Sequence, residues 1–501
     1  VFVLFRRTKV CSTSQRAGHR PTTRFSMTWR PTLPFACAWA TRNGRSYGAM
    51  NGQNGAKRWR SRSRRRWSPK QAPKKRPQVP KVFSETPFYL RAWRKRKLEE
   101  EQLLLEQQQQ GGKVAKSRTE SDSSEPDNGE KSLGTVNEEI VHFKWSKGQV
   151  LNNRYELQSL SGDGTFGRVC MARDWTQNRQ VAIKITRDVK RYTDNAKVEA
   201  HILEKLAKAD PDGKHRTCVL YDTFIHDNKH FCLVMEPMGP SLYDYIKNNH
   251  YRGFCLEDMQ TITKQTLHAL DFLHGKVNMV HTDLKPENIL ITSTEYPRQS
   301  FFPRKEFWEA KGNKCSSKYY RPREANVKII DFGNAVFPGE HHSTTINTRQ
   351  YRGPEVVLQL GWNQSSDVWS VGCIFMELYT GELLFDTHDN LEHLALMERI
   401  LGPLPANMLE RASEDVKEKL LKESSTLPGQ WQLNWPEGAT RSDSARHVGC
   451  HRRIDTLVKP GGCHTQFLEV VKMLLTFDPS ERPRARDVLK CAFFQGYVYE
   501  E

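Results

Sequence analysis

The sequence predicts an α+β protein in which a small β-rich lobe precedes a larger helical lobe, with a mostly disordered basic tail ahead of both. Three observations predict this organisation. The positive charge is confined to the first 150 residues, strand-like segments follow one another from Tyr155, and helical periodicity dominates after Gly239. We place the tail at residues 1–150 and the folded part at residues 155–494.

The formal net charge of +19 is distributed unevenly along the 501 residues. Residues 1–150 contain 32 Lys and Arg against 12 Asp and Glu, whereas residues 151–501 contain 45 against 46. The basic excess therefore belongs to the tail, which excludes a uniformly basic, histone-like protein. The mean hydropathy of −0.71 is low for a chain of this length and indicates that part of it cannot bury a core.

The tail lacks sustained periodicity apart from one stretch. An Arg/Ser run spans Arg58–Lys70, and compact basic clusters lie at Lys74–Pro77 and Arg94–Lys97. Arg91–Gln110 favours a solvated helix because oppositely charged residues recur four positions apart; a partner-binding coiled coil is the alternative. Residues 117–131 are acidic and Ser-rich, as is typical of a linker.

Cysteine spacing and hydropathy exclude two further classes. The eleven Cys residues form no CxxC pair and no zinc-like set with His, so reduced thiols of the cytosol or nucleus are expected. The longest apolar run, Trp369–Phe385, contains Glu377 and Glu382, so we expect no membrane span.

The first lobe is predicted from alternating, β-branched segments. YELQSL from Tyr155, RVCMARD from Arg168 and QVAIKIT from Gln180 indicate three strands, and Asn195–Lys208 has helical spacing of apolar residues. HFCLVMEPMG from His230 reads as a buried strand that ends in a Gly-Pro turn. We place the first lobe at about 155–238 and the second at about 239–494.

A glycine-rich loop connects the first two of these strands. Gly162, Gly164 and Gly167 fit G-x-G-x-x-G-x-V, which ends at Val169. The pattern alone is weak because glycine-rich turns between strands are common. A dinucleotide-binding fingerprint needs a strand followed by a helix, whereas here a strand follows. Two strands joined in this way let backbone N–H groups approach a phosphate closely.

A lysine and a carboxylate are expected to pair behind this loop. Lys184 lies among β-branched residues of a central strand, where a buried ammonium needs a partner. Glu199, fifteen residues further on in the predicted helix, is the favoured partner; Glu204, more than a turn beyond, is the alternative. Such a pair orients the α- and β-phosphates of ATP.

Two further segments indicate phosphoryl transfer. In HTDLKPENIL, Asp283 precedes Asn288 by five residues, and in VKIIDFG, Asp331 follows an apolar strand. One carboxylate can orient a hydroxyl, while the amide and the second carboxylate can hold Mg²⁺. Charge that spreads over phosphate oxygens requires cations held in fixed places.

These motifs, in this order, resemble the eukaryotic protein kinases over roughly Tyr155–Phe494. Arg352-Gly353-Pro354-Glu355 is similar to the family's A-P-E, with Gly for Ala, and Asp367-Val368-Trp369-Ser370 resembles its helix-F anchor. Arg482 resembles the structural partner of Glu355. The resemblance implies a bilobal protein kinase fold.

Within the kinases, Glu392–Pro403 (EHLALMERILGP) is similar to the signature of LAMMER, or CDC-like, kinases in the CMGC group. Read without the family, this segment is an amphipathic helix closed by Gly-Pro. Thr282 replaces the usual Arg of H-R-D, as in LAMMER and SR-protein kinases, and residues 293–326 form an insertion of the kind that LAMMER kinases carry as an extra hairpin. Leu396, Gln350 and Gly353 depart from the LAMMER pattern and put fine substrate preference in doubt.

The resemblance implies ATP and Mg²⁺ as cofactors and assigns a role to each motif residue. Asp283 would orient the substrate hydroxyl, Lys285 would steady the γ-phosphate, and Asn288 and Asp331 would hold Mg²⁺. Lys184 would bind the α- and β-phosphates. Met235 would be the gatekeeper next to a hinge over 236–238. The implied nucleotide-binding residues are Ser161, Gly162, Asp163, Gly164, Thr165, Phe166, Gly167, Arg168, Val169, Ala182, Lys184, Glu199, Met235, Glu236 and Met238.

The resemblance also implies partners and location. LAMMER kinases are dual-specificity enzymes that phosphorylate Arg/Ser-rich splicing factors on Ser or Thr, autophosphorylate on Tyr and are typically nuclear. Residues 351–400, with two basic and eight acidic residues, are a candidate landing surface for such substrates, or simply a solvated acidic face. Thr282 carries no charge to clamp an activation-segment phosphate, so we expect activity without that clamp. We expect a monomer in the nucleus, with some in the cytoplasm.

Three alternatives remain open at this point. The chain resembles SR-protein and DYRK kinases too, and only the LALMER segment argues against those branches. A kinase-fold scaffold would be indicated by a lost catalytic Lys, Asp or Gly, and none is lost. An RNA-binding protein would work through the basic tail, yet aromatics there are sparse and no RNA-binding motif is present, which leaves at most a weak RNA contact.

Overall fold

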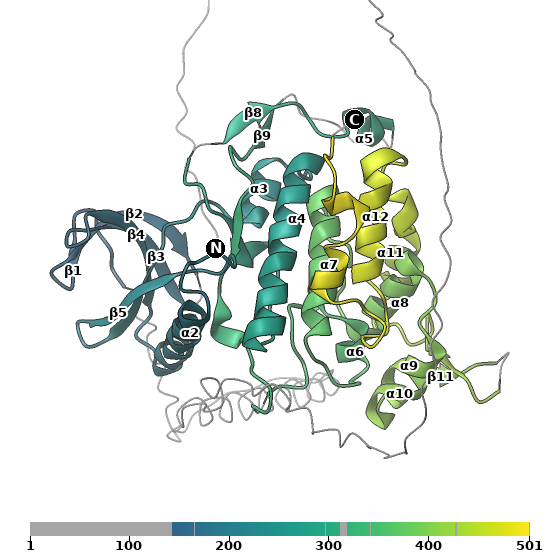
Figure 1. The fold of residues 1–501 in the computed structure, drawn as a ribbon. Coiled ribbons are helices and arrows are strands. Elements are labelled where there is room, and N and C mark those ends of the chain that lie inside the picture. The colour runs from purple at the N-terminus through teal and green to yellow at the C-terminus, as the bar shows by residue number, and fades with distance from the viewer. Residues whose placement is uncertain are drawn as a thin grey trace, which may run out of the picture. The chain divides into compact units, whose positions relative to one another are not determined.

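The computed structural model describes residues 143–499, except 165, 296, 311–317, 341 and 426–427. Most of the expected tail, including the candidate helix Arg91–Gln110, and Thr165 of the glycine-rich loop lie outside the described residues. Figure 1 shows a twisted sheet with one long helix, followed by a set of packed helices. The predicted α+β, bilobal fold is confirmed.

The first lobe is an antiparallel sheet with the strand order β1-β2-β3-β4-β6-β5. Its strands are β1 (Val150–Leu151), β2 (Tyr155–Asp163), β3 (Gly167–Asp174), β4 (Arg179–Thr186), β5 (Leu220–His226) and β6 (His230–Met235). Alternating side chains such as Leu157, Cys170 and Ile183 are fully buried between the strands, which is why the period-two pattern predicted them.

Helix α2 (Lys190–Ala209) begins before the start expected from its apolar spacing, Asn195. Its extra first turn includes Tyr192, which is buried and meets the ring of Phe166 edge-on at 5.4 Å. Phe166 belongs to the glycine-rich loop. A tertiary contact therefore extends the helix, and periodicity within the helix could not reveal it.

The packed chain begins before Tyr155. Phe143 is buried against the sheet, where its ring meets His226 and His230 edge-on, and β1 pairs with β2. The backbone oxygen of Phe143 accepts a 2.5 Å hydrogen bond from Arg168. Residues 143–150, which the sequence analysis assigned to the tail, are thus part of the first lobe.

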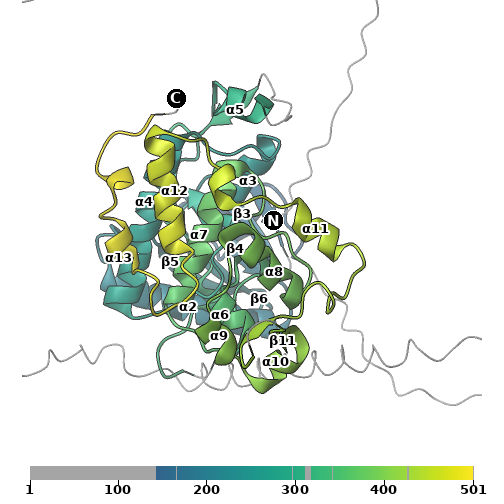
Figure 2. The ribbon, with the colours of Figure 1, turned by 90° about the vertical axis from the view of Figure 1, so that its right-hand side faces the viewer.

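The second lobe is helical and surrounds helix α7. Its principal helices are α3 (Leu242–Asn248), α4 (Leu256–Asp271), α6 (Pro354–Val357), α7 (Ser365–Thr380), α8 (Asn390–Leu401), α9 (Ala406–Glu410), α10 (Glu414–Leu420), α11 (Ser444–Cys450), α12 (Gly462–Leu474) and α13 (Ala485–Val488). Figure 1 shows α4 and α12 on either side of α7, and Figures 1 and 2 show α8 and α11 side by side. Short strand pairs β7 (Ile289–Ile291) with β10 (Val327–Ile329) and β11 (Leu421–Glu423) with β12 (Trp431–Leu433) complete the lobe.

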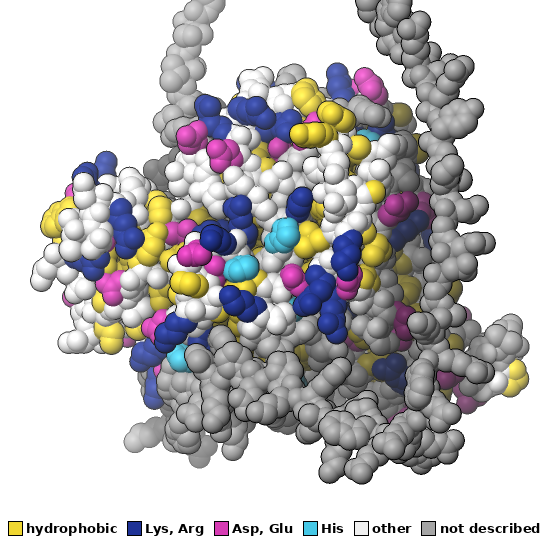
Figure 3. All heavy atoms as spheres, viewed as in Figure 1, with side chains coloured by type: hydrophobic (Ala, Val, Ile, Leu, Met, Phe, Trp, Pro, Cys, Tyr) yellow, Lys and Arg dark blue, Asp and Glu magenta, His cyan; other side chains and the backbone are white. Residues whose placement is uncertain are grey.

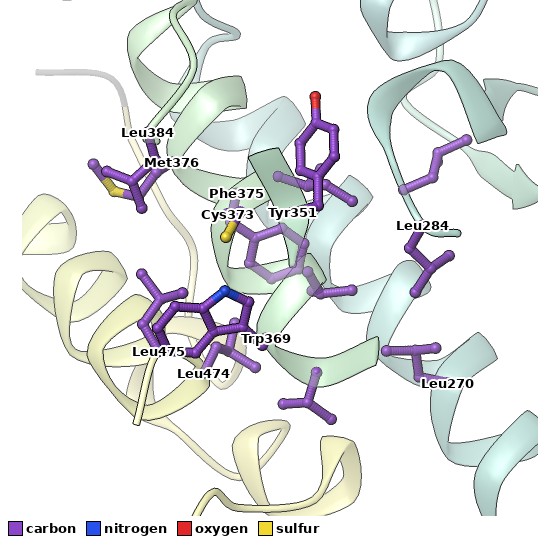
Figure 4. Close-up of a cluster of buried hydrophobic side chains, with 14 of the residues drawn as sticks. Leu270, Leu284, Tyr351, Trp369, Cys373, Phe375, Met376, Leu384, Leu474 and Leu475 are labelled. Carbon is purple, nitrogen blue, oxygen red and sulfur yellow. The ribbon is translucent and has the colours of Figure 1, made fainter. Parts of the chain in front are cut away.

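Helix α7 is the centre of the core. Every residue from Ser366 to Tyr379 is buried, and Figure 4 shows Trp369 beside Leu474 and Leu475. This helix accounts for most of the longest apolar run of the sequence, because a helix covered on all sides is apolar all round. Among the described residues, no helix combines the length and apolar character needed to cross a membrane.

A buried ion pair joins the segment before α7 to the end of the chain. Glu355 and Arg482 form two hydrogen bonds, of 2.8 and 3.0 Å, and neither side chain is exposed. Arg482 also donates to the backbone oxygens of Ser365 and Phe477. The pair predicted from the resemblance is therefore present and joins distant segments.

Replacing Arg482 with Met should destabilise the protein severely. The change leaves the Glu355 carboxylate buried without its cation, which typically costs about 3–5 kcal/mol. We expect the urea unfolding midpoint to drop strongly, whereas Arg486→Met, at an exposed ion pair with Asp271, should change the free energy of unfolding by less than about 1 kcal/mol. Equal midpoints for the two variants would contradict the structural role of the pair.

The LALMER segment forms helix α8, and it is more buried than an amphipathic surface helix. Leu391 through Met397 are all buried, Asp389 caps the helix, and Gly402 ends it with a φ of +122°. Glu392 lies inside, where it accepts hydrogen bonds from Ser444 and His388. The two faces expected from the sequence are thus both packed, because α11 covers the polar side.

The insertion at 293–326 contains a hairpin and a helix. Strands β8 (Arg298–Ser300) and β9 (Tyr319–Arg321) pair, and α5 (Lys305–Ala310) lies between them in sequence. Residues 296 and 311–317 of the insertion lie outside the described residues. Hydrogen bonds join its second strand to Asn249 at the end of α3 and to Asp258 in α4.

Candidate active site

The glycine-rich loop closes β2 onto β3 at one end of the sheet. Gly162 pairs with Val169, Asp163 pairs with Arg168, and the Gly164 N–H donates to the Gly167 oxygen. A Cβ on Gly167 would lie 2.1 Å from the backbone oxygen of Ile185, so only glycine fits. The side chain of Arg168 pairs with Asp163, which holds the two strands of the loop together. Ser161, in β2, enters the loop with its side chain exposed.

Lys184 lies behind this loop on β4. Its Nζ is 2.7 Å from Glu199 Oε2 on α2 and 3.7 Å from Asp331 Oδ1. Burial by itself would lower the pKa of Lys184, but the two carboxylates outweigh it and raise the pKa. Glu204, the alternative partner, is exposed. The structure therefore brings together Lys184 and Glu199, as the spacing favoured.

The hinge between the lobes contributes backbone and apolar surface. Met235 at the end of β6 faces Ala182 across the strands, and Met238 packs against the core. The carboxylate of Glu236 is engaged elsewhere, by Lys328 at 2.6 Å and by the Val219 N–H at 2.9 Å. Only the backbone of Glu236 can therefore meet a nucleotide.

The catalytic loop places a carboxylate between two donors. Asp283 accepts hydrogen bonds from Lys285 Nζ and from Thr348 Oγ1, each at 2.7 Å, on its two different oxygens. Thr348 was not among the expected site residues. The signal available was its position in the short TRQYRGPE segment, but nothing in the sequence indicated contact with Asp283. Thr348 thus holds the Asp283 carboxylate next to the activation segment, the stretch between Asp331 and Glu355 to which Thr348 belongs.

A buried aspartate of α7, Asp367, holds the backbone of the catalytic loop in place. Asp367 accepts hydrogen bonds from the backbone N–H groups of His281 and Thr282 and from the ring of His274. Burial would raise the pKa of Asp367, but these donors lower it. The carboxylate therefore stays ionised and holds two consecutive backbone groups of the loop.

Asn288 and Asp331 provide the oxygens that a hard cation prefers. The Asn288 amide donates to the Asp283 backbone oxygen at 2.9 Å, and Asp331 adopts a left-handed backbone with φ 63°. Burial opposes ionisation of Asp331, but Lys184, His281 and Lys285 lower its pKa. Oxygen ligands on these two side chains fit Mg²⁺, which completes its shell with substrate phosphates. No cluster of three or more His, Cys, Asp or Glu side chains suited to a metal occurs in the described part of the chain.

Thr282, which replaces an arginine, anchors the activation segment without charge. Its hydroxyl donates to the Asn334 oxygen at 2.8 Å, and its backbone oxygen accepts from the backbone and side-chain amides of Asn347. Asn347 also donates to Ser370 on α7. Neutral hydrogen bonds hold the segment where a phosphate clamp would otherwise act, and activity without that clamp stays a prediction.

The comparisons with known proteins agree with this geometry. Residues 155–494 match the protein kinase domain family. Serine/threonine-protein kinase AFC3 of Arabidopsis thaliana is 41% identical over 362 residues, which cover 71% of this chain and 85% of AFC3. Dual specificity protein kinase CLK1 of Homo sapiens is 37% identical over 360 residues, covering 71% of this chain and 69% of CLK1. A crystal structure of the kinase domain of PF14_0431 matches with a TM-score of 0.64 and 40% identity, covering 71% of this chain and 99% of that one.

A bilobal fold with a Lys–Glu pair, a catalytic-loop Asp and an Asn–Asp oxygen pair defines a protein kinase, and the chain belongs to the protein kinase family. Within it, the AFC and CLK relatives place the chain among the LAMMER, or CDC-like, kinases of the CMGC group. The expected branch is therefore confirmed.

The arrangement explains phosphoryl transfer from the chain's own residues. ATP with Mg²⁺ supplies the phosphoryl group and the cation charge, as in protein kinases generally. Asp283 would accept a hydrogen bond from the substrate hydroxyl and orient it, while Lys285 would neutralise charge next to it. Lys184, steadied by Glu199, is positioned to donate to phosphate oxygens.

Proposed function

We propose that this kinase phosphorylates Ser or Thr in Arg/Ser-rich proteins such as splicing factors, and that it autophosphorylates on Tyr. The AFC relatives are named serine/threonine-protein kinases and the CLK relatives dual specificity protein kinases, which supports this range of acceptors. The observation that carries the arginine preference is a pair of carboxylates, Glu287 and Glu377, beside the catalytic loop.

Glu287 is four residues after Asp283, on the short helical turn Pro286–Asn288. One oxygen of its carboxylate is buried and accepts no hydrogen bond, and burial raises the pKa of this side chain. Burial raises the pKa of Glu377, on α7, to about 7, and the nearby charge of Glu287 adds to this increase. A buried carboxylate oxygen that accepts no hydrogen bond destabilises the protein by about 1–3 kcal/mol or more. A guanidinium group of the substrate would donate the hydrogen bond that the Glu287 oxygen lacks.

Several of the acidic residues in 351–400 cannot belong to a landing surface for Arg/Ser-rich substrates, because they are not at the surface. Glu355, Asp367, Glu377 and Glu392 are buried, and each bonds to residues of the protein itself. Glu392, one of the eight acidic residues of this candidate surface, is only 1% exposed. The count of acidic residues in this segment assumed that they are exposed, because charged residues usually are. We therefore base the substrate preference on Glu287, whose buried oxygen accepts no hydrogen bond, and give Glu377 only the supporting role of a second negative charge next to it.

A peptide phosphorylation assay with ATP and Mg²⁺ tests the proposal. An Arg/Ser peptide should be a better substrate than a Ser-Pro peptide and far better than an acidic one. Glu287→Gln should lower kcat/KM for the Arg/Ser peptide by about tenfold or more, since a charge-assisted hydrogen bond contributes roughly 1.5–3 kcal/mol. The exposed Glu382→Gln is the matched control and should behave as the wild type. Preference for acidic peptides would overturn the substrate class while leaving kinase activity intact.

The same pair predicts a pH dependence. Glu377 has a pKa raised to about 7, so it becomes negatively charged only as the pH rises through neutrality. The KM for an Arg/Ser peptide should therefore fall between pH 6 and pH 8 relative to that for a neutral peptide. Glu377→Gln should flatten this difference. A KM ratio that is independent of pH in the wild type would contradict a role for Glu377 in binding arginine.

We also propose that the protein accumulates in the nucleus through the tail clusters Lys74–Arg76 and Arg94–Lys97. The support is their charge and the branch of the family. Replacing both clusters with Ala in the full chain should shift a fluorescent fusion towards the cytoplasm. Unchanged nuclear accumulation would show that the clusters are not the signal and would favour weak, non-specific RNA contact by the tail.

A further inference from the structure

The insertion at 293–326 concentrates positive charge in a lobe that otherwise lacks it. It contains eight Lys and Arg against four Asp and Glu, whereas residues 151–501 as a whole contain 45 against 46. Nothing in phosphoryl transfer uses this segment. Figure 3 shows basic and hydrophobic side chains next to one another over β8 and β9, at the top of that view.

The inner face of the β8–β9 hairpin is anchored to the protein. Tyr319 donates to the Gly253 oxygen at 2.8 Å, and Arg321 forms two hydrogen bonds with the buried Asp258. The side chain of Asn249 pairs with both backbone groups of Tyr320. These contacts fix the hairpin and leave its outer face with no part in holding the fold.

The outer face carries two aromatic rings that the fold does not need. Gln299 faces Tyr320 across the strands, and Phe301 directly follows β8 on the same side. Phe301 is 56% exposed and Tyr320 is 37% exposed. In the described part of the chain, neither ring stacks on another aromatic ring.

A cavity of about 490 Å³ opens beside Phe301. It is lined by Phe301, Phe302 and Phe307, by Arg304, Lys305 and Lys459, and by Glu306 and Pro460. Its volume lies within the range of small-molecule sites, about 300–1,000 Å³. Apolar rings with cationic side chains close by match a group that has a flat apolar face and an anionic part.

We propose that the outer face of β8–β9 and the adjoining cavity bind single-stranded nucleic acid, with bases stacked on Phe301 and Tyr320 and phosphates near Lys305 and Lys459 of the cavity. Every base offers a π-face to an aromatic ring, and the amide of Gln299 adds hydrogen-bonding capacity. The net positive charge of the insertion favours a polyanion over an apolar protein partner. This site is separate from the catalytic loop and does not depend on the proposed substrate class.

The test measures binding of a fluorescein-labelled 12-nucleotide single-stranded RNA to the full chain over a range of salt concentrations. The basic tail will also bind phosphate, but that binding depends steeply on salt. Stacking contributes about 1–3 kcal/mol per base, so Phe301→Ala with Tyr320→Ala should weaken binding at least tenfold without changing the salt dependence. A 4-thiouridine version of the RNA should cross-link to the segment 298–321.

Two controls make the result decisive. Trp175→Ala removes an aromatic ring in the first lobe that is 52% exposed, and it should leave RNA affinity unchanged. Duplex RNA has no free bases to stack, so the double variant should not weaken its binding. The double variant should still phosphorylate a neutral peptide, which shows that it is folded. Equal RNA affinity of the double variant and Trp175→Ala, or cross-links confined to residues 1–150, would overturn the proposal.

Discussion

Asp283→Asn should reduce phosphate transfer by about 10²–10⁴-fold while the protein stays folded. The amide keeps an oxygen to accept from Thr348, but it places an NH₂ group towards Lys285 and can neither accept the hydroxyl proton nor hold it by charge. Packing changes little because the two side chains are nearly isosteric. Turnover with saturating ATP and peptide measures the effect.

The control for this variant is Asp212→Asn, at an exposed ion pair with Lys214 in the first lobe. It should turn over at the wild-type rate, and circular dichroism should show the same melting temperature for both variants within a few degrees. Autophosphorylation on Tyr should disappear together with peptide phosphorylation, because one site performs both. Wild-type turnover by the Asp283→Asn protein would defeat the assignment of Asp283.

Lys184→Met should lower kcat/KM for ATP by about 10²–10³-fold, comparable to the loss of one preorganised donor to a reacting anion. Methionine preserves the length of the side chain but removes the cation that lies 2.7 Å from Glu199 and 3.7 Å from Asp331. These two carboxylates would then face each other without a counter-charge. Their repulsion would disfavour the ionised form of Asp331 and lower the affinity of this site for Mg²⁺.

Lys197→Met on the same helix as Glu199 is the matched control, since Lys197 is exposed on α2. It should leave kinetics with ATP unchanged. A second measurement separates the two effects of Lys184→Met: raising Mg²⁺ should recover only part of the lost activity, because the phosphate contact itself is gone. Complete recovery would show that Lys184 acts solely through Asp331.

The sequence by itself determined the chemistry of the site. Spacing within local segments located Lys184, Asp283, Asn288 and Asp331, because each belongs to a strand or loop whose neighbours are fixed by the chain. The position along the predicted helix also favoured Glu199 over Glu204, which lies more than a turn further on. These predictions needed no knowledge of which distant segments meet.

Only the tertiary structure decided which charged and polar residues are buried and what they contact. Thr348 meets Asp283 across 65 residues of sequence, and Glu377 comes close to Glu287 from another helix. Glu392, counted as surface, is covered by Ser444 of α11. Periodicity reports the faces of one element at a time, whereas the burial of a carboxylate depends on donors that arrive from elsewhere in the chain.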